Sequence, residues 1–280
     1  MSTTREKIEE IRNPFPSETS LRIIEFQENH KLQILTVFGN FIKTFEDIFD
    51  FFNTAIYAIN YVPKKSWGIQ KSIQFLFFPQ TLKTIYCGFD NFLRGYYDES
   101  VTLLRSAYET AFRTIFISCF PKEYESVFYN KSGQRQFNLT NFLEDILKID
   151  CGFVYRIMSK IGHSKVLRVQ EELHGRRKGQ IKTPVSLKYE FDFPSSAMCV
   201  NFINLNLALH FQNLWILFYD DLKSILKEEN FIKGEKVKNL LLLFIQENSE
   251  PAFSKISADL EKIASILTEV KYGKKRRKKT

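Results

Sequence analysis

The 280-residue sequence is poor in the residues that turn or cross-link a polypeptide chain. It contains 11 glycines and eight prolines, and an all-β protein would need more turns than these residues supply. Its four cysteines form no CxxC pair and no other metal-ligand spacing, and all lie beside apolar residues: Cys87, Cys119, Cys151 and Cys199. We therefore expect buried free thiols rather than disulfides, and we expect no metal and no other cofactor.

Signatures of export, membrane insertion and common enzyme classes are also missing. Residues 1–11 carry charges and lack the apolar core of a secretory signal. The most apolar stretches, 72–89 and 202–219, contain too many polar side chains for a lipid-facing span. The sequence has no Walker loop, dinucleotide glycine fingerprint, HExxH or GxSxG motif. These absences favour a cytoplasmic protein without a membrane partner.

The residues that are abundant favour helices. The sequence is 44% hydrophobic and 26% charged, with 28 phenylalanines that can fill a helical core. Between about residues 28 and 61, apolar side chains recur every three or four positions, which is typical of one buried helix face. Similar stretches predict helices over about 28–61, 69–94, 99–120, 195–228, 235–246 and 252–270, with shorter helices over 123–130, 141–148 and 153–162.

These patterns predict an all-α protein, a multi-helix bundle of about seven helices with a long basic loop. Pro79 should kink or divide the second helix, and Asp98 is a suitable N-cap for the third. We expect one helical domain over 21–270, preceded by a partly ordered leader over 1–20 and followed by a disordered basic tail over 271–280. A polar stretch over 164–194 forms the loop.

The positive charge is concentrated in two segments. The net charge is +8, but seven of the 40 basic residues lie within 271–280, which leaves 33 basic residues against 32 acidic ones. Residues 160–190 hold eight basic and three acidic side chains, including the run Arg176, Arg177 and Lys178 just after His174. A basic loop and tail of this kind suit phosphate binding to nucleic acid or contact with an acidic partner. A solubilising role for the tail is the alternative.

The predicted helix over 99–120 carries a charged stripe. Arg105, Glu109 and Arg113 are spaced four residues apart, so they share one helix face. A glutamate between two arginines can hold both guanidinium groups through charge-assisted hydrogen bonds. Such a stripe is either a salt-bridge network that fixes helix packing or a surface that faces an anion such as phosphate.

A second stripe follows at Tyr155, Ser159 and His163, again at four-residue spacing. A helix would place a phenol, a hydroxyl and an imidazole on one face, with the histidine at the helix C-terminus, where the dipole favours its charged form. These groups could bind or process a substrate. Alternatively, His163 caps the helix and Ser159 bonds a backbone carbonyl.

Together these segments resemble a helical prokaryotic family of unknown function. Residues 95–100 and 104–109 match its "G-Y-x-x-E-A/S…L-x-R-S-x-x-E" helix, and Tyr155, Ser159 and His163 match its "Y-x-x-x-S-x-x-x-H" segment. Members are similar in outline to abortive-infection and HEPN-type proteins. Over 95–163, the resemblance implies an all-α bundle in which Arg105, Glu109 and His163 converge.

HEPN ribonucleases carry an Arg-x(4–6)-His motif whose arginine and histidine are implied to polarise an RNA phosphate and assist attack by the 2′-hydroxyl. Arg156 with His163, and Arg168 with His174, fit this spacing. Apolar residues directly follow both arginines, where that family carries a polar one.

Two hypotheses follow from the sequence. The first is an RNA- or nucleotide-directed defence protein, a metal-independent ribonuclease with Arg105, Glu109 and His163 as catalytic residues. Its substrate-binding residues would be Tyr155, Ser159, Arg113, His174, Arg176, Arg177 and Lys178. The second is a non-catalytic binding or scaffold protein whose basic loop and tail contact nucleic acid or an acidic partner. A second copy of the chain is a further candidate partner. A membrane-surface binder acting through the tail is a weaker third alternative, since no amphipathic anchor accompanies the tail.

Overall fold

The computed structural model describes residues 17–62, 67–128, 137–149, 152, 154–161, 191, 193–246 and 251–276. Within these ranges the protein is all-α, as predicted, and contains no strand. Ten bounded helical elements occur there, more than the seven or so predicted. Most of the predicted basic loop lies outside the described residues.

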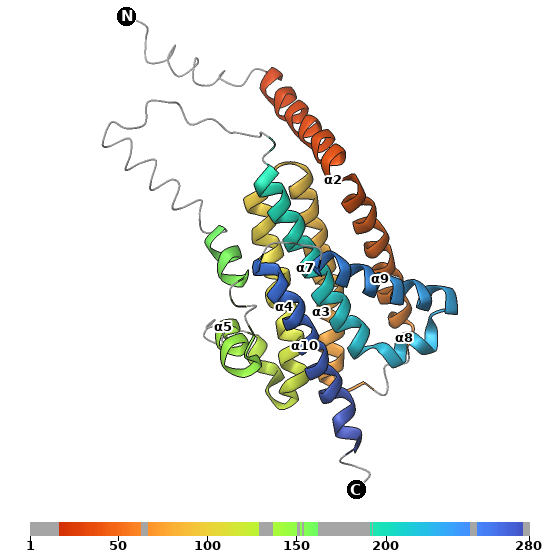
Figure 1. Ribbon diagram of the computed structural model, residues 1–280. Coiled ribbons are helices and arrows are strands. Elements are labelled where there is room, and N and C mark those ends of the chain that lie inside the picture. The colour runs from red at the N-terminus through yellow and green to blue at the C-terminus, as the bar shows by residue number, and fades with distance from the viewer. Residues whose placement is uncertain are drawn as a thin grey trace, which may run out of the picture.

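Seven α-helices form the body of the molecule (Figure 1). They are α2 (Ser17–Asn60), α3 (Ile69–Leu93), α4 (Tyr97–Cys119), α7 (Phe193–Leu217), α8 (Tyr219–Ile225), α9 (Glu228–Gln246) and α10 (Pro251–Arg276). Between α4 and α7 lie shorter elements, namely the 3-10 helix η2 (Pro121–Val127), α5 (Leu139–Asn141), the π-helix η3 (Phe142–Leu147) and a helical stretch over 154–161.

Helices α3 and α4 form an antiparallel hairpin around a tight turn. Gly95 adopts a left-handed φ of +83° in this turn, a conformation that glycine reaches without the steric cost of a Cβ. The backbone N–H of Gly95 donates to Phe92 O, and that of Tyr96 donates to Asn91 O at 2.8 Å. These bonds satisfy carbonyls at the end of α3 and direct α4 back along α3.

Helix α7 is the central helix of the bundle. It contacts α3, α4, α9 and α10, and Figure 1 shows it running beside the α3–α4 hairpin. Most of its side chains are buried, as expected for a helix that is apolar on several sides. Two of its polar residues donate to α4 carbonyls: His210 Nε2 bonds Ala107 O, and Asn213 Nδ2 bonds Ala111 O, both at 3.0 Å.

Aromatic side chains fill much of the interior. Phe45 and Phe89 stack with ring centroids 3.8 Å apart, which joins α2 to α3. Phe211 and Trp215 stack along α7 at 5.5 Å. Of the described cysteines, Cys199 is buried and free, as predicted, whereas Cys87 and Cys119 are free but only half-buried.

Several predicted boundaries were wrong. Helix α2 begins at Ser17 rather than near residue 28 and bends at Phe38, whose φ and ψ are −118° and 24°. Pro79 does not divide α3, which runs through it as one helix; its side chain is exposed, so its ring does not intrude into the core.

Two further boundaries differ as well. The predicted helix over 195–228 is interrupted at Phe218 and continues as α8. Asp98 lies in the first turn of α4, and the N-cap position is Tyr96.

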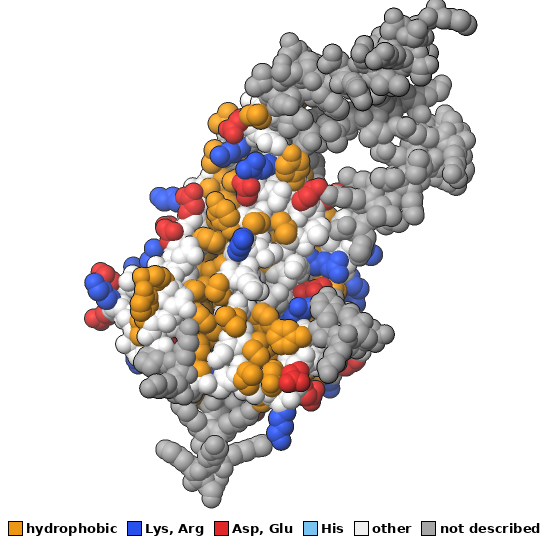
Figure 2. All heavy atoms as spheres, turned by 180° about the vertical axis from the view of Figure 1, so that it is seen from behind, with side chains coloured by type: hydrophobic (Ala, Val, Ile, Leu, Met, Phe, Trp, Pro, Cys, Tyr) orange, Lys and Arg blue, Asp and Glu red, His pale blue; other side chains and the backbone are white. Residues whose placement is uncertain are grey.

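The surface of the described part carries mixed charge. Figure 2 shows basic and acidic side chains interspersed around hydrophobic ones on the face that it presents. Among the described helices, none is both long enough and apolar enough to span a lipid bilayer.

Candidate functional site

The charged stripe predicted from the sequence lies on one face of α4. Glu109 sits between the two arginines. Its Oε1 is 3.6 Å from Nη2 of Arg105, and its Oε2 is 3.7 Å from Nη2 of Arg113. The exposed side-chain fractions are 23% for Arg105, 19% for Arg113 and 12% for Glu109. The stripe is therefore mostly buried, yet part of each arginine side chain remains exposed to solvent.

Tyr155 reaches this stripe from the helical stretch over 154–161. Its hydroxyl donates to Glu109 Oε1 at 2.6 Å and accepts a hydrogen bond from Arg105 Nη2 at 3.1 Å. The guanidinium carbon of Arg105 also lies 5.1 Å from the centroid of the Tyr155 ring, within the range of a cation–π contact. The structure thus brings together four predicted site residues from two segments that are about fifty positions apart in the sequence.

The cluster formed by Arg105, Glu109, Arg113 and Tyr155 combines two cations with one anion. Counted over these four side chains alone, two guanidinium groups stand against one carboxylate. The Nε–H of Arg105 is buried and has no hydrogen-bond partner. Leaving such a donor unsatisfied costs about 1–3 kcal/mol. A cluster with surplus positive charge can attract a phosphate or carboxylate group.

Ser159 belongs to the same helical stretch but does not join the cluster. Its hydroxyl donates to the backbone carbonyl of Tyr155 at 2.8 Å, which is the structural role weighed as the alternative. His163, His174, Arg176, Arg177 and Lys178 lie outside the described residues. Arg156, next to Tyr155, is exposed and pairs with Glu144.

The interior side of α4 holds polar contacts that were not predicted as part of a site. His210 is completely buried, and this burial lowers the pKa of its imidazole from 6.5 to about 4, although the bond to the Ala107 carbonyl acts in the opposite direction. The ring is neutral at physiological pH, and its Nε2 carries the proton that it donates. With Asn213, it fixes α7 against the α4 segment that carries Arg105 and Glu109. The signal in the sequence was a few polar residues within the otherwise apolar stretch over 202–219.

A second polar network, also not predicted, ties the start of α4 to α2 and α7. The Nδ1–H of His30 donates to the Leu93 carbonyl at 2.9 Å, so its Nε2 accepts from the Tyr97 hydroxyl at 2.7 Å. Tyr97 in turn lies 2.7 Å from the hydroxyl of Ser196. Burial lowers the pKa of His30, which favours this neutral form. The network connects four helices, α2, α3, α4 and α7, around the Gly95 turn.

Within the described residues, no group of three or more histidine, cysteine, aspartate or glutamate side chains is placed to hold a metal ion. The cluster on α4 itself offers guanidinium, carboxylate and phenol groups. Comparisons with protein-family models, with curated proteins and with solved structures found no match to this chain.

Proposed function

We propose that the protein is RNA- or nucleotide-directed and that the cluster of Arg105, Glu109, Arg113 and Tyr155 binds a phosphate group. The observation that carries this proposal is the pair of arginines on either side of one carboxylate, together with the unsatisfied Nε–H of Arg105. A guanidinium offers a planar set of donors that matches the oxygens of a phosphate. The side chains of Arg105 and Arg113 are each about one-fifth exposed, so part of each lies open to an approaching anion.

Glu109 and Tyr155 would position the arginines in this proposal. The carboxylate lies between the guanidinium groups, and the phenol covers one face of Arg105. A phosphate oxygen would meet two preorganised cations without having to order two long side chains, which reduces the entropy lost on binding. The basic loop with His174, Arg176, Arg177 and Lys178 would add non-specific attraction for a polyanion.

The resemblance to abortive-infection and HEPN-type proteins extends the proposal to metal-independent RNA cleavage in antiviral defence. In that form, Arg105 would stabilise the phosphate while Glu109 and His163 would transfer protons to and from the reacting oxygens. Ser159 contributes little to this form, because its hydroxyl is engaged by a backbone carbonyl.

The alternative is a non-catalytic binding or scaffold protein. It is favoured by the 2.6 Å hydrogen bond from Tyr155 to Glu109, which engages both groups in holding the 154–161 segment against α4. In this alternative the cluster fixes packing, and contact with nucleic acid or an acidic partner is left to the basic loop and tail.

The binding part of the proposal is tested with a short labelled single-stranded RNA and fluorescence anisotropy. Arg105→Gln should weaken binding by about threefold to tenfold and reduce the slope of log affinity against log salt by about one. The matched control is Arg94→Gln, which removes the same charge from an exposed surface pair with Asp90 (Arg94 side chain 52% exposed). Its RNA affinity should stay close to that of the parent. Equal affinities of the two variants would contradict phosphate binding at the cluster.

The cleavage part needs a separate assay. The parent and His163→Ala are incubated with labelled RNA in the presence of a metal chelator, and the products are resolved by electrophoresis. Cleavage by the parent alone would support the ribonuclease hypothesis. Equal cleavage by both proteins would exclude His163 as a catalyst, and RNA binding without cleavage would favour the alternative.

A further inference from the structure

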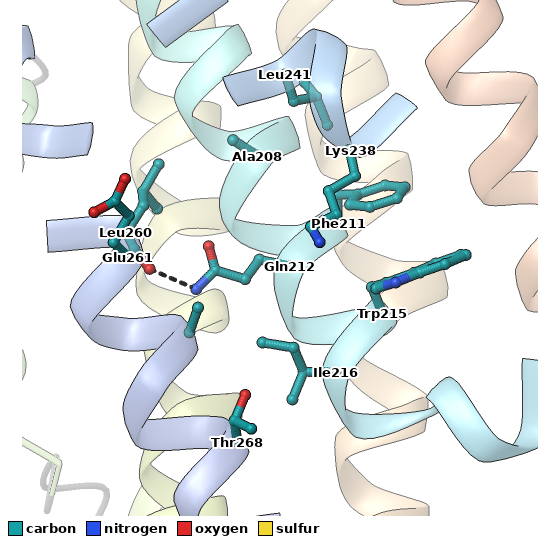
Figure 3. A pocket seen from close by; sticks show the side chains of 11 residues that line it. Ala208, Phe211, Gln212, Trp215, Ile216, Lys238, Leu241, Leu260, Glu261 and Thr268 are labelled. Atoms are coloured by element: carbon teal, nitrogen blue, oxygen red, sulfur yellow. Dashed lines mark hydrogen bonds between the residues drawn. The ribbon is translucent and has the colours of Figure 1, made fainter. Parts of the chain in front are cut away.

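A cavity lies on the opposite side of α7 from its contacts with Ala107 and Ala111 on α4. Its volume is about 340 Å³, and α7, α9 and α10 line it (Figure 3). Small-molecule sites in proteins begin at about 300 Å³, and an engineered apolar cavity of about 150 Å³ is large enough to bind benzene. The space here is therefore of the right size for a bicyclic ring system.

The α7 wall of the cavity is aromatic and well packed. The rings of Phe211 and Trp215 lie nearly parallel, with an interplanar angle of 15°. Trp215 also packs against Phe231 of α9 and Phe51 of α2, with ring centroids 5.0 and 6.0 Å away. Both wall rings are buried, so their positions do not depend on a ligand.

The remaining walls are mainly apolar, and small residues on two helices leave the space open. Ala208 on α7 and Ala264 on α10 stand where larger side chains would occupy the volume. Ile216, Leu241 and Leu260 add apolar lining, and Thr268 adds one hydroxyl. Gln212 supplies a central polar group. Its Nε2 donates to the Leu260 carbonyl at 2.8 Å, which leaves its amide oxygen as a hydrogen-bond acceptor on the cavity side.

The rim carries one charge of each sign. Lys238 and Glu261 are both exposed, and Figure 3 shows them on opposite sides of Gln212. An ionised ligand would be attracted to one and repelled by the other, and it would lose hydration against the apolar walls. A neutral molecule avoids both penalties.

From these observations we infer that the cavity binds a small, neutral, bicyclic aromatic molecule that carries one hydrogen-bond donor. Its ring system lies against Phe211 and Trp215, and its N–H or O–H group donates to the amide oxygen of Gln212. This site is separate from the cluster on α4 and does not depend on phosphate binding there.

The test uses 5-fluoroindole as the probe and fluorine NMR of the probe with the full-length protein. The parent should broaden and shift the probe signal in a saturable manner. Ala264→Leu places a larger side chain at the half-buried wall and should weaken binding by about tenfold or more, since it removes most of the free volume. The matched control is Ala197→Leu, a half-buried position on α7 that does not line the cavity.

Retained binding by Ala197→Leu together with lost binding by Ala264→Leu supports the inference. Equal affinities of the two variants, or no saturable binding by the parent, would overturn it. The ligand class is tested with 5-fluoroindole-2-carboxylate, which should bind at least about tenfold more weakly, because its ionised group must be desolvated at the rim. Equal or tighter binding of this anion would overturn the assignment of a neutral ligand. Circular dichroism of each variant confirms that the helices are retained.

Discussion

Replacing Gly234 with alanine tests how closely α9 approaches α7. A Cβ at position 234 would lie 2.5 and 2.6 Å from Cζ3 and Cη2 of Trp215 and 2.7 Å from Cζ of Phe51. Carbon atoms pack best at about 3.5–4.0 Å, so the methyl group would overlap both rings by about 1 Å. Trp215 is 5% exposed and Phe51 is 1% exposed, so neither ring can move into solvent.

The size of the effect follows from two opposing contributions. Overpacking a buried site costs about 1–3 kcal/mol, and this site lies near the upper end because Phe51 is itself packed against Phe211 and Trp215. Alanine recovers about 1 kcal/mol of helix propensity relative to glycine. We expect Gly234→Ala to lower the free energy of unfolding by about 2 kcal/mol, which corresponds to a decrease in Tm of roughly 4–8 °C.

Gly39→Ala is the matched control. Gly39 also lies within a helix, α2, but its added Cβ would have no atom within 4 Å. This variant should be more stable than the parent by up to about 1 kcal/mol. The assay is urea denaturation followed by far-UV circular dichroism. If Gly234→Ala is as stable as Gly39→Ala, then α9 does not approach Trp215 and Phe51 as closely as described.

Three further variants test other parts of the structure. Burial lowers the pKa of His210 from 6.5 to about 4. As the pH falls from about 6.5 to about 4, the unfolded chain therefore takes up a proton at this residue and the folded protein does not. The free energy of unfolding should decrease by on the order of 3 kcal/mol over that window. His210→Gln keeps an amide donor for the Ala107 carbonyl but removes the titratable imidazole. In urea titrations at several pH values, this variant should therefore show a flatter dependence of stability on pH. An unchanged dependence would contradict the burial of a neutral His210. Glu109→Gln should cost about 1–3 kcal/mol, since it leaves two mostly buried guanidinium groups without their shared carboxylate. The exposed Glu125→Gln should leave stability unchanged. Gly95→Ala places an alanine in a left-handed backbone conformation, with its Cβ 3.1 Å from the His30 ring. It should lower the free energy of unfolding by at least about 1 kcal/mol in the same assay. A smaller decrease would contradict the strained turn.

The helical class and the charged stripe could be predicted because both depend on local spacing. Apolar residues at three- and four-residue intervals predict a helix wherever it packs, and Arg105, Glu109 and Arg113 share a face once the helix forms. The contact of Tyr155 with this stripe depends on how the 154–161 segment returns to α4, which spacing alone does not determine. The expectation that Arg105, Glu109 and His163 converge came from the family resemblance. His163 lies outside the described residues.

Other features depend on tertiary contacts that leave no local signal. Phe218 interrupts the predicted long helix although neither glycine nor proline is present there. It is fully buried against Trp67, Phe75 and Phe78, and this packing overrides its helical neighbours. The cavity beside α7 was not predicted either, since Ala208 and Ala264 come from helices whose pairing becomes evident only in the fold.

The phosphate-binding proposal is tested most directly at the Nε–H group of Arg105. Side-chain NMR of ¹⁵N-labelled arginine would follow this resonance, assigned with the Arg105→Lys variant, while inorganic phosphate or a short RNA is added. Our account predicts saturable shifts of the Arg105 and Arg113 signals and no change at the exposed Arg94. Shifts confined to Arg94 and other exposed arginines, with Arg105 unchanged at saturating RNA, would contradict phosphate binding at the cluster.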